Sequence, residues 1–238
     1  MPASTTFVLV HGAWHGGWCW SPVASILRGR GHTVVTPTQT GLGERSHLLS
    51  PAINLEVFIA DIVNVLVWEE LTDVVLVGHS FGGAAISGAA DRAADRIRQL
   101  VYLDALILDN GQSGLSQLPA DVREPRTRAA QRSSAGLTMP APPPSAFGIT
   151  DLVQTAWVGR RLTPHPFATY TSPLQLASPV AHGLPTSYIV CADPIYSPLA
   201  ASRDWAKAHG WKMTDIASGH DAMVIAPVLL ADLLDVGV

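Results

Sequence analysis

Ser80 is the residue of this chain whose surroundings best suit a nucleophile. It lies in Gly-His-Ser-Phe-Gly, residues 78–82, directly after the apolar run 74–77 and before the small-residue segment 83–90. A buried strand, a sharp turn and a helix form the context in which Gly-x-Ser-x-Gly lifts a serine hydroxyl above a sheet. The flanking glycines leave space where side chains would collide with neighbouring backbone. The pattern predicts covalent catalysis by Ser80, with the N–H of Phe81 aimed at a developing oxyanion.

A serine hydroxyl attacks at neutral pH only if a base takes its proton and a third group fixes the tautomer of that base. His220 is the predicted base among nine histidines, because it follows the last predicted strand, where the carboxyl ends of parallel strands converge. His11 and His15 are expected to shape a glycine-rich loop, and His79 is expected to point away from the site. Neither a metal site nor a cofactor is expected, because no spacing typical of metal ligands occurs among His32, His47, His165, His182 and His209.

Two aspartates compete for the acid position, because both follow predicted strands. Asp104 ends the strand next after the nucleophile strand, whereas Asp193 follows Cys191 by two residues and precedes Pro194. We favour Asp104, since it needs no irregularity in the chain to point into the site, and we keep Asp193 as the alternative. The other aspartate is expected to be a turn or capping residue. Asp221 is expected to cap the closing helix.

Strands and helices alternate along most of the chain, which predicts a doubly wound, mostly parallel six-stranded α/β sheet with right-handed crossovers. We expect strands at 7–10, 33–36, 74–77, 99–104, 187–191 and 211–216, and helices at 20–30, 54–68, 83–90, 199–208 and 224–234. A chain of 238 residues is long enough for one such domain, and we assign all of 1–238 to it.

Residues 106–182 break this alternation. They contain many prolines and scattered aromatic residues, with no sustained period of two or 3.6. We interpret this stretch as a cap inserted over the carboxyl edge of the sheet. Trp14 and the cap aromatics Phe147, Trp157 and Tyr170 are the candidates to line an apolar substrate pocket, with structural packing as the alternative for each.

The composition excludes several classes of protein. Hydrophobic residues make up 47% and charged residues 14%, as in a compact globular protein, and the net charge is −4 without a basic run, so nucleic-acid binding is not expected. Residues 1–6 lack the features of a signal peptide, and no run of about 18 apolar residues occurs, so we expect a cytoplasmic protein without membrane contact. Cys19 and Cys191 are far apart, and no disulfide is expected.

Three stretches of this sequence carry a resemblance to a known family. They are Phe-Val-Leu-Val-His-Gly-Ala-Trp-His-Gly-Gly-Trp at 7–18, Gly-His-Ser-Phe-Gly-Gly at 78–83 and Ser-Gly-His-Asp-Ala-Met at 218–223. Together they resemble the α/β-hydrolase fold, in the branch of plant methylesterases, hydroxynitrile lyases and related bacterial carboxylesterases. The resemblance implies Ser80 as nucleophile, His220 as base, and the backbone N–H groups of Ala13 and Phe81 as oxyanion donors. A homodimer is expected from this resemblance alone.

Two departures from that family bear on the site. In its plant members the acid follows the penultimate strand, at a position that falls near Ile195 here, with Asp193 slightly early, whereas some haloalkane dehalogenases have the acid where Asp104 stands. The hydroxynitrile lyases carry a lysine after the base and a threonine in the oxyanion loop, where this chain has Asp221 and Gly12. An anion beside the base disfavours a departing cyanide, which weakens the lyase interpretation.

The sequence therefore predicts a serine carboxylesterase that hydrolyses a small to medium apolar or aromatic ester through an acyl-enzyme. Its only expected partner, apart from a second copy of itself, is this small-molecule substrate. A hydroxynitrile lyase-like enzyme that uses the same triad is one alternative. A ligand receptor built on a hydrolase fold, without catalysis, is the other.

Overall fold

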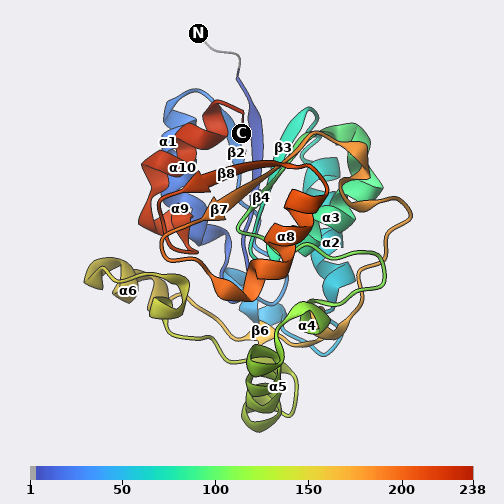
Figure 1. Cartoon of the computed structure of the whole chain (residues 1–238), viewed down its shortest axis with the longest axis vertical. Coiled ribbons are helices and arrows are strands. Elements are labelled where there is room, and N and C mark those ends of the chain that lie inside the picture. Colours follow the sequence, from blue (N-terminus) through green and yellow to red (C-terminus); the bar gives the residue numbers. More distant parts are fainter. Residues whose placement is uncertain (1–3, 238) are drawn as a thin grey trace.

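The computed structural model describes residues 4–237, and its centre is a six-stranded sheet in which every neighbouring pair of strands is parallel (Figure 1). The strand order is β2-β1-β3-β4-β7-β8. These strands are β1 (Thr6–Val10), β2 (Thr33–Val35), β3 (Val74–His79), β4 (Ile97–Leu103), β7 (Thr186–Cys191) and β8 (Lys212–Ile216). The prediction of a six-stranded, doubly wound α/β sheet is confirmed.

Helices cover both faces of this sheet (Figure 1). One face carries α1 (Ser21–Gly29), α9 (Ala222–Ile225) and α10 (Pro227–Asp235), and the other carries α2 (Leu55–Trp68), α3 (Gly82–Ala93) and α8 (Ala200–Ala208). Side chains alternate between the faces along each strand: Phe7 and Leu9 enter one apolar cluster, and Val8 and Val10 enter the other. Burial on both faces explains why the strands read as nearly continuous apolar runs.

The end of the chain differs from the single helix predicted over 224–234. The chain forms α9, leaves helical geometry at Ala226 (φ −133°), and begins α10 at Pro227. Proline has no N–H for a continuing helix, so it starts a new one. Asp221 precedes α9, but its side chain makes no capping hydrogen bond, so that prediction was wrong. Within residues 4–237, no helix combines the length and the apolar character that a membrane span requires.

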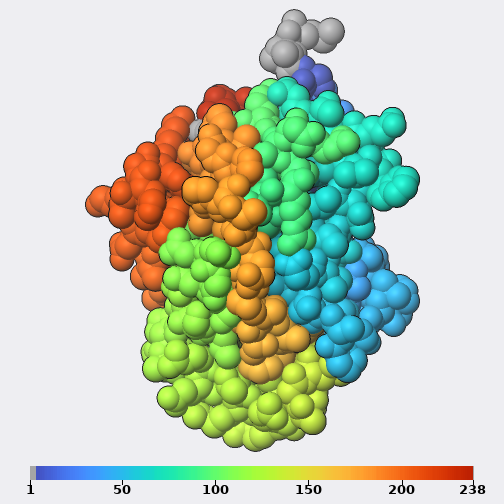
Figure 2. Space-filling view, turned by 90° about the vertical axis from the view of Figure 1, so that its right-hand side faces the viewer, coloured from blue at the N-terminus to red at the C-terminus, as the bar shows by residue number. Residues whose placement is uncertain are grey.

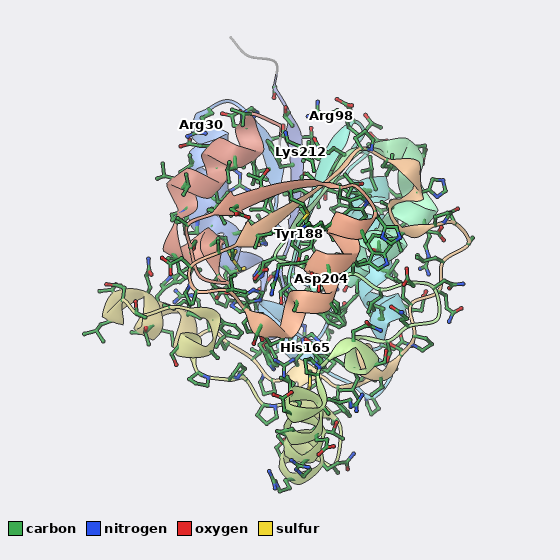
Figure 3. The ribbon with its side chains drawn as sticks, viewed as in Figure 1. Arg30, Arg98, His165, Tyr188, Asp204 and Lys212 are labelled. Atoms are coloured by element: carbon green, nitrogen blue, oxygen red, sulfur yellow. The ribbon has the colours of Figure 1, made fainter. Side chains whose placement is uncertain are left out.

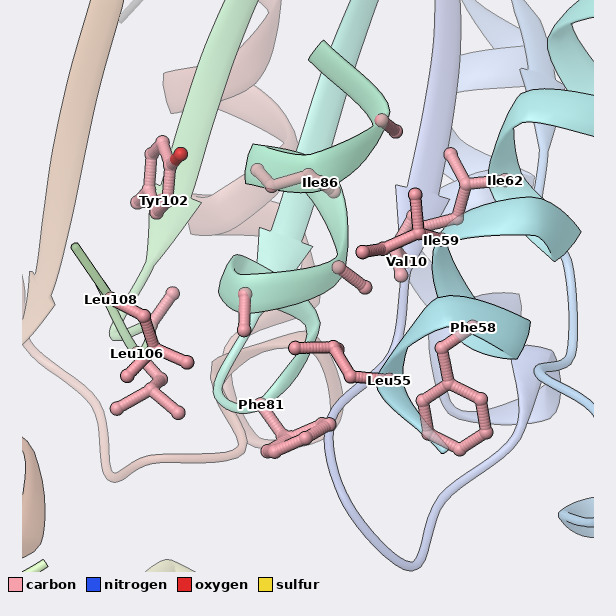
Figure 4. Close-up of a cluster of buried hydrophobic side chains, with 14 of the residues drawn as sticks. Val10, Leu55, Phe58, Ile59, Ile62, Phe81, Ile86, Tyr102, Leu106 and Leu108 are labelled. Atoms are coloured by element: carbon pink, nitrogen blue, oxygen red, sulfur yellow. The ribbon is translucent and has the colours of Figure 1, made fainter. Parts of the chain in front are cut away.

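α2 and α3 pack closely because their contact is made through a glycine. A Cβ at Gly88 of α3 would lie 2.3 Å from the Cδ1 atom of Ile59 on α2. Figure 4 shows Ile59 and Ile62 on α2 and Ile86 on α3 in the same buried cluster. This contact holds α3, the helix that follows the Ser80 turn, in place.

Most of residues 106–182 lie at the carboxyl ends of the strands (Figure 1) and in the lower part of the molecule in Figure 2. Residues 177–182 run back beside α3, where the N–H groups of Ala177 and Ser178 donate to Asp91. The whole segment 106–182 contains α4 (Gly114–Gln117), α5 (Ala120–Ser134), α6 (Leu152–Gly159), α7 (Ala168–Thr171) and a small antiparallel sheet of β5 (Thr138–Met139) and β6 (His165–Pro166). Sequence reasoning missed α5, because Pro125 stands inside it and Ala130 is its one fully buried residue. That this segment works as a cap on a single domain of 1–238 stays a prediction.

Gly88→Ala and Gly29→Ala make the same chemical change in two helices and should act in opposite directions. In α3 the new methyl group meets Ile59, and we expect the free energy of unfolding to fall by about 1–3 kcal/mol. Gly29, in the last turn of α1, has nothing within 4 Å of an added Cβ, so alanine there should raise that free energy by up to about 1 kcal/mol through helix propensity. Urea unfolding measures both changes. Equal effects of the two substitutions would contradict the tight contact between α2 and α3.

Candidate active site

Ser80 occupies a strained turn between β3 and α3. Its φ of 53° lies in the left-handed region, which costs about 1–3 kcal/mol for a residue with a side chain. The Ser80 N–H donates to the Leu103 carbonyl at 3.2 Å, and the Ser80 carbonyl accepts from the N–H groups of Gly83 and Leu106 at 3.0 and 2.8 Å. Hydrogen bonds from both sides of the turn, in β4 and in α3, therefore hold the serine in this conformation.

Glycines permit the close packing around this turn. A Cβ at Gly78 would lie 2.9 Å from the Gly82 carbonyl oxygen, and a Cβ at Gly82 would lie 2.8 Å from the His11 carbonyl oxygen. These distances confirm that side chains at 78 and 82 would collide with backbone. A Cβ at Gly12 would lie 2.6 Å from the Cβ of Ser80, so the loop after β1 touches the serine directly.

Ser80, His220 and Asp104 form a continuous hydrogen-bonded relay. The Ser80 hydroxyl donates to His220 Nε2 at 2.9 Å, and His220 Nδ1–H donates to Asp104 Oδ2 at 2.6 Å. Asp104 directly follows β4, and His220 lies in the loop after β8, so both sit at the carboxyl edge of the sheet. His220 is 2% exposed and Asp104 is fully buried. With its proton on Nδ1, the imidazole leaves Nε2 free to take the serine proton.

Asp104 has a second, cationic partner. Its Oδ1 accepts from Arg203 Nη1 of α8 at 3.2 Å, and the same Nη1 lies 3.0 Å from the Tyr196 carbonyl. The Asp104 N–H donates to the Ile189 carbonyl of β7 at 2.7 Å. A buried carboxylate is costly unless it is paired and hydrogen-bonded, and Arg203 supplies that compensation here.

Asp193 lies away from this relay. Its side chain is exposed, and its N–H donates to the Ser218 carbonyl at 3.0 Å. Ile195, where the plant relatives' acid would fall, is 58% exposed. In the part of the chain that the structure describes, the Asp193 carboxylate makes no hydrogen bond or ion pair with His220. Of the two candidate acids, the structure therefore brings Asp104 to the imidazole and leaves Asp193 outside.

The backbone N–H groups of Ala13 and Phe81 belong to the two segments that meet at Ser80. Phe81 follows the serine and precedes α3, whose N-terminal end carries a positive partial charge. Ala13 follows Gly12, which touches Ser80. Among the backbone hydrogen bonds of residues 4–237, neither N–H has a protein acceptor. Unpaired donors beside a nucleophile are the groups that an oxyanion needs.

Trp14 ties the loop after β1 to the 106–182 segment. Its N–H donates to His165 Nδ1 at 3.3 Å, its indole N–H donates to the Met139 carbonyl at 3.2 Å, and its carbonyl accepts from the Thr163 N–H at 3.0 Å. Its φ of 66° is left-handed. The loop that supplies Ala13 is therefore held by contacts about 125–151 residues away in sequence.

His165 is a residue of the site that sequence reasoning missed. Its Nε2–H donates to Thr169 Oγ1 at 2.8 Å, which leaves Nδ1 to accept from Trp14. Burial, followed by the positive charge of neighbours such as Arg126, holds the pKa of His165 well below its usual value, so the ring stays neutral. Figure 3 shows His165 between the sheet and α5. A histidine in an aperiodic stretch gave no signal of this role.

A narrow pocket with a free volume of only about 10 Å³ lies beside Ser80. Its walls are largely apolar or aromatic and come from the loop after β1, the Ser80 turn, the 106–182 segment and the loop after β7. They are formed by Trp14, Ser80, Phe81, Leu106, Leu118, Arg126, Tyr170, Tyr196, Pro198 and Leu199. Trp14 and Tyr170 are thus at the pocket, as the sequence suggested.

Trp157 and Phe147 are not among these walls. Trp157, on α6, packs edge-on against Trp18 at 5.1 Å between ring centroids, under the guanidinium of Arg161 at 4.9 Å. Phe147 packs on His15 at 5.1 Å. The structure therefore places Trp157 away from the pocket at Ser80, in the lining of a separate apolar pocket with Leu152 and Val224. A role of Trp157 in substrate binding stays a prediction.

His15 and Asp221 form a buried ion pair below the site. Asp221 Oδ2 lies 2.9 Å from His15 Nε2, and His15 Nδ1–H donates to the Ala13 carbonyl at 2.8 Å. Burial lowers the pKa of His15, but the charge and hydrogen bond of Asp221 outweigh it and raise that pKa above its usual value. Burial raises the pKa of Asp221, but His15 outweighs it, and that pKa is lowered. Each member of the pair therefore favours the charged form of the other.

This pair changes the argument about the residue after the base. The carboxylate of Asp221 does not line the pocket and is balanced by His15. Its charge therefore weighs less against a lyase than the sequence suggested. A lyase-type threonine would not fit at position 12 of the oxyanion loop, because a Cβ there would collide with Ser80.

The histidines next to these residues serve as backbone supports. His79 Nε2–H donates to the His220 carbonyl at 3.0 Å, so the residue before the nucleophile holds the backbone of the base. His11 Nδ1–H donates to the Gly12 carbonyl at 2.8 Å, and its Nε2 accepts from the Gln39 N–H at 3.0 Å. Burial lowers the pKa of His11 to about 3, so it remains neutral. Among residues 4–237, no cluster of three or more His, Cys, Asp and Glu side chains suits a metal ion.

The chain belongs to the alpha/beta hydrolase family, whose model matches residues 7–233. A carbendazim hydrolyzing esterase of Nocardioides sp. is 41% identical over 240 residues, covering 96% of this chain and 97% of that protein. Methylesterase 2 of Arabidopsis thaliana is 34% identical over 109 residues, which cover 45% of this chain and 41% of the plant protein. The resemblance to esterases of this fold is therefore confirmed.

Solved structures agree with this assignment. An extracellular alpha/beta-hydrolase from a Paenibacillus species superimposes with a TM-score of 0.85 at 27% identity, over 97% of both chains. Tomato methylketone synthase I has a TM-score of 0.81 at 19% identity, over 98% of this chain and 96% of the other. At that identity the second comparison shows a common fold alone.

Replacing Asp221 by asparagine should destabilise the protein most between about pH 3.8 and 6.5. The lowered pKa of Asp221 means that its contribution is present above the usual value of 3.8 and is lost as the pH falls through the folded value. The raised pKa of His15 means that its contribution is present below 6.5 and is lost as the pH rises through the folded value. Loss of one member of a buried pair costs about 3–5 kcal/mol in this window.

Urea unfolding of the native protein and Asp221→Asn at acid, mildly acid and alkaline pH measures this difference. Asp215→Asn is the control, because that side chain is exposed on β8. A loss of stability that is the same at every pH would contradict a charged His15–Asp221 pair.

Proposed function

We propose that this protein is a serine carboxylesterase that hydrolyses small-molecule esters. The observation that carries the proposal is the relay from Ser80 through His220 to Asp104, with distances of 2.9 and 2.6 Å. Nucleophile, acid and base then follow one another along the chain in the order Ser, Asp, His, which is common in this fold. The names of two relatives, the carbendazim hydrolyzing esterase and a pyrethroid hydrolase of Sphingobium wenxiniae, support the same class of reaction.

In the first half of the reaction Ser80 Oγ attacks the ester carbonyl carbon. His220 Nε2 takes the hydroxyl proton as the new C–O bond forms, and the positive imidazolium is stabilised by Asp104. The carbonyl oxygen becomes an oxyanion, which the N–H groups of Ala13 and Phe81 bind. His220 then returns its proton to the alcohol oxygen, the C–O bond to the alcohol breaks, and an acyl-enzyme on Ser80 remains.

In the second half a water molecule takes the place of the alcohol. His220 removes a proton from the water, whose oxygen attacks the acyl carbon, and the same two N–H groups hold the second oxyanion. Collapse of this intermediate returns the proton to Ser80 Oγ and releases the carboxylic acid. No group outside the relay needs to change its protonation state.

The lining of the pocket supports esters with an apolar part. Leu106, Leu118 and Leu199 supply apolar surface, and Phe81 and Tyr170 stack at 4.3 Å to form one aromatic wall. Alkyl and small aromatic groups match this lining.

Ser80→Ala should remove hydrolysis of p-nitrophenyl acetate almost completely, because the covalent route is lost. We expect kcat/KM to fall by about 10⁴-fold or more, and labelling of the native protein by a phosphonate to be absent in the variant. Ser133→Ala, an exposed position on α5, is the matched control and should behave as the native protein does. Equal activity, or equal inactivity, of native protein and Ser80→Ala would contradict the proposal and favour tests of cyanohydrin cleavage and of ligand binding without turnover.

Asp104→Asn and Asp193→Asn distinguish the two candidate acids. Asparagine at 104 cannot stabilise the imidazolium and can hold the ring in the wrong tautomer, so we expect kcat to fall by about 10³–10⁴-fold. Asp193→Asn, at an exposed position, should change kcat by less than about threefold. Steady-state kinetics with the same ester measure both. A large loss in Asp193→Asn with little loss in Asp104→Asn would reverse the assignment.

A further inference from the structure

Arg126 places a guanidinium in the wall of the pocket that contains Ser80. It projects from α5, and its Nη2 donates to the Tyr196 hydroxyl at 3.0 Å. Its Cζ lies 5.2 Å from the ring centroid of Trp14, within the range of a cation–π contact. Both neighbours belong to the same pocket, so the charged end of the partly buried Arg126 is held at the site.

Arg126 has no carboxylate partner in the described part of the chain. No Asp or Glu oxygen of residues 4–237 forms an ion pair with it, whereas Arg128 on the same helix pairs with Glu124 at 3.3 Å. Asp104, the carboxylate of the relay, is already bound to His220 and Arg203. The site therefore contains a positive charge that the protein itself leaves without a negative partner.

The surroundings make this charge costly. Leu106, Leu118 and Leu199 line the same pocket, and a guanidinium next to apolar walls loses hydration. Burial lowers the pKa of Arg126, but Tyr170 and Tyr196 outweigh it and keep that pKa above its usual value, so the side chain stays charged. Hydrogen bonds to the phenols of Tyr196 and Tyr170 and one aromatic face do not use the whole fork of five N–H donors.

The position of Arg126 is linked to the catalytic base through one aromatic ring. The ring of Tyr196 stacks on His220 with centroids 4.0 Å apart and an interplanar angle of 19°. The hydroxyl of the same tyrosine accepts the hydrogen bond from Arg126. A group attached to the ester a few bonds from its carbonyl would therefore extend from Ser80 toward this guanidinium within one pocket.

We propose that Arg126 binds a carboxylate carried by the substrate, so that the preferred esters are half esters of small dicarboxylic acids. A guanidinium fork accepts a carboxylate through two parallel hydrogen bonds, and the pairing would balance the charge that the protein leaves open. It would also offset the repulsion between this carboxylate and the oxyanion that forms beside Ser80. The inference rests on the proposed esterase function and adds the class of ester to it.

Monomethyl glutarate and dimethyl glutarate test this proposal as a matched pair, because they differ only in whether the second carboxylate is free. The measured quantity is the ratio of kcat/KM for the half ester to that for the diester, corrected for the diester's two equivalent groups. We expect this ratio to exceed one in the native protein and to fall about tenfold or more in Arg126→Gln. Arg126→Lys, which keeps the charge but not the fork, should give an intermediate ratio.

Arg128→Gln is the control, since it removes an exposed arginine from the same helix and should leave the ratio as in the native protein. The proposal is overturned if the native ratio is below one, or if Arg126→Gln leaves the ratio unchanged, in which case Arg126 only links α5 to Tyr196 and Trp14. If Arg126→Gln does not fold, inhibition of the native protein decides: glutarate must inhibit hydrolysis of p-nitrophenyl acetate at lower concentration than glutaramide, and equal inhibition overturns the proposal.

Failure of the esterase function gives a different result. In that case neither glutarate ester nor p-nitrophenyl acetate is hydrolysed in a Ser80-dependent way. Titration calorimetry of glutarate with the native protein and Arg126→Gln then tests the carboxylate site alone. Binding that weakens about tenfold in the variant supports the site, and the absence of binding to the native protein overturns it.

Discussion

The left-handed backbone of Ser80 is the constraint on which the rest of the site depends. A residue with a side chain adopts φ of 53° only if its surroundings impose that conformation. Here the end of β3 is surrounded by β4, the start of α3 and the loop after β1, and the glycines at 12, 78 and 82 let these backbones meet. The same convergence of strand ends brings Asp104 and His220 to the serine, so one packing arrangement fixes both Ser80 and the imidazole that accepts its hydrogen bond.

Charge around the site is distributed unevenly. Asp104 is shared between His220 and Arg203, and Asp221 is neutralised by His15, so both fully buried carboxylates have cationic or titratable partners. Each pair also binds a backbone carbonyl: Arg203 donates a hydrogen bond to the Tyr196 carbonyl, and His15 donates one to the Ala13 carbonyl. Arg126 differs, because its guanidinium faces a pocket rather than a carboxylate. The compensated charges hold backbone around the site, and the uncompensated one lines the pocket beside Ser80, where we propose that substrate binds.

The sheet was predictable from sequence because its strands are short, buried and valine-rich, and the turn at Ser80 was predictable because its glycines follow such a strand. The position of His220 after the last predicted strand then indicated it as the base. The choice between Asp104 and Asp193 stayed open because both follow strands, and only the three-dimensional positions show that one carboxylate meets the imidazole and the other is exposed. Asp221 was misjudged for the same reason: its position before α9 suggested a cap, but its side chain pairs with His15, 206 residues away.

The 106–182 segment was beyond sequence reasoning because contacts with distant residues, not a local apolar period, determine its structure. Tryptophans at 14 and 157 look equivalent as aromatic candidates, yet only the first lies at the pocket. Trp14 is also the residue directly after Ala13, and its N–H, indole and carbonyl are all bonded to this segment. The part of the chain that shapes the pocket therefore also holds the backbone beside Ala13, the oxyanion donor that we propose. Changes in this segment that alter which ester fits should for that reason also alter the rate of the chemical step, because the two properties share Trp14.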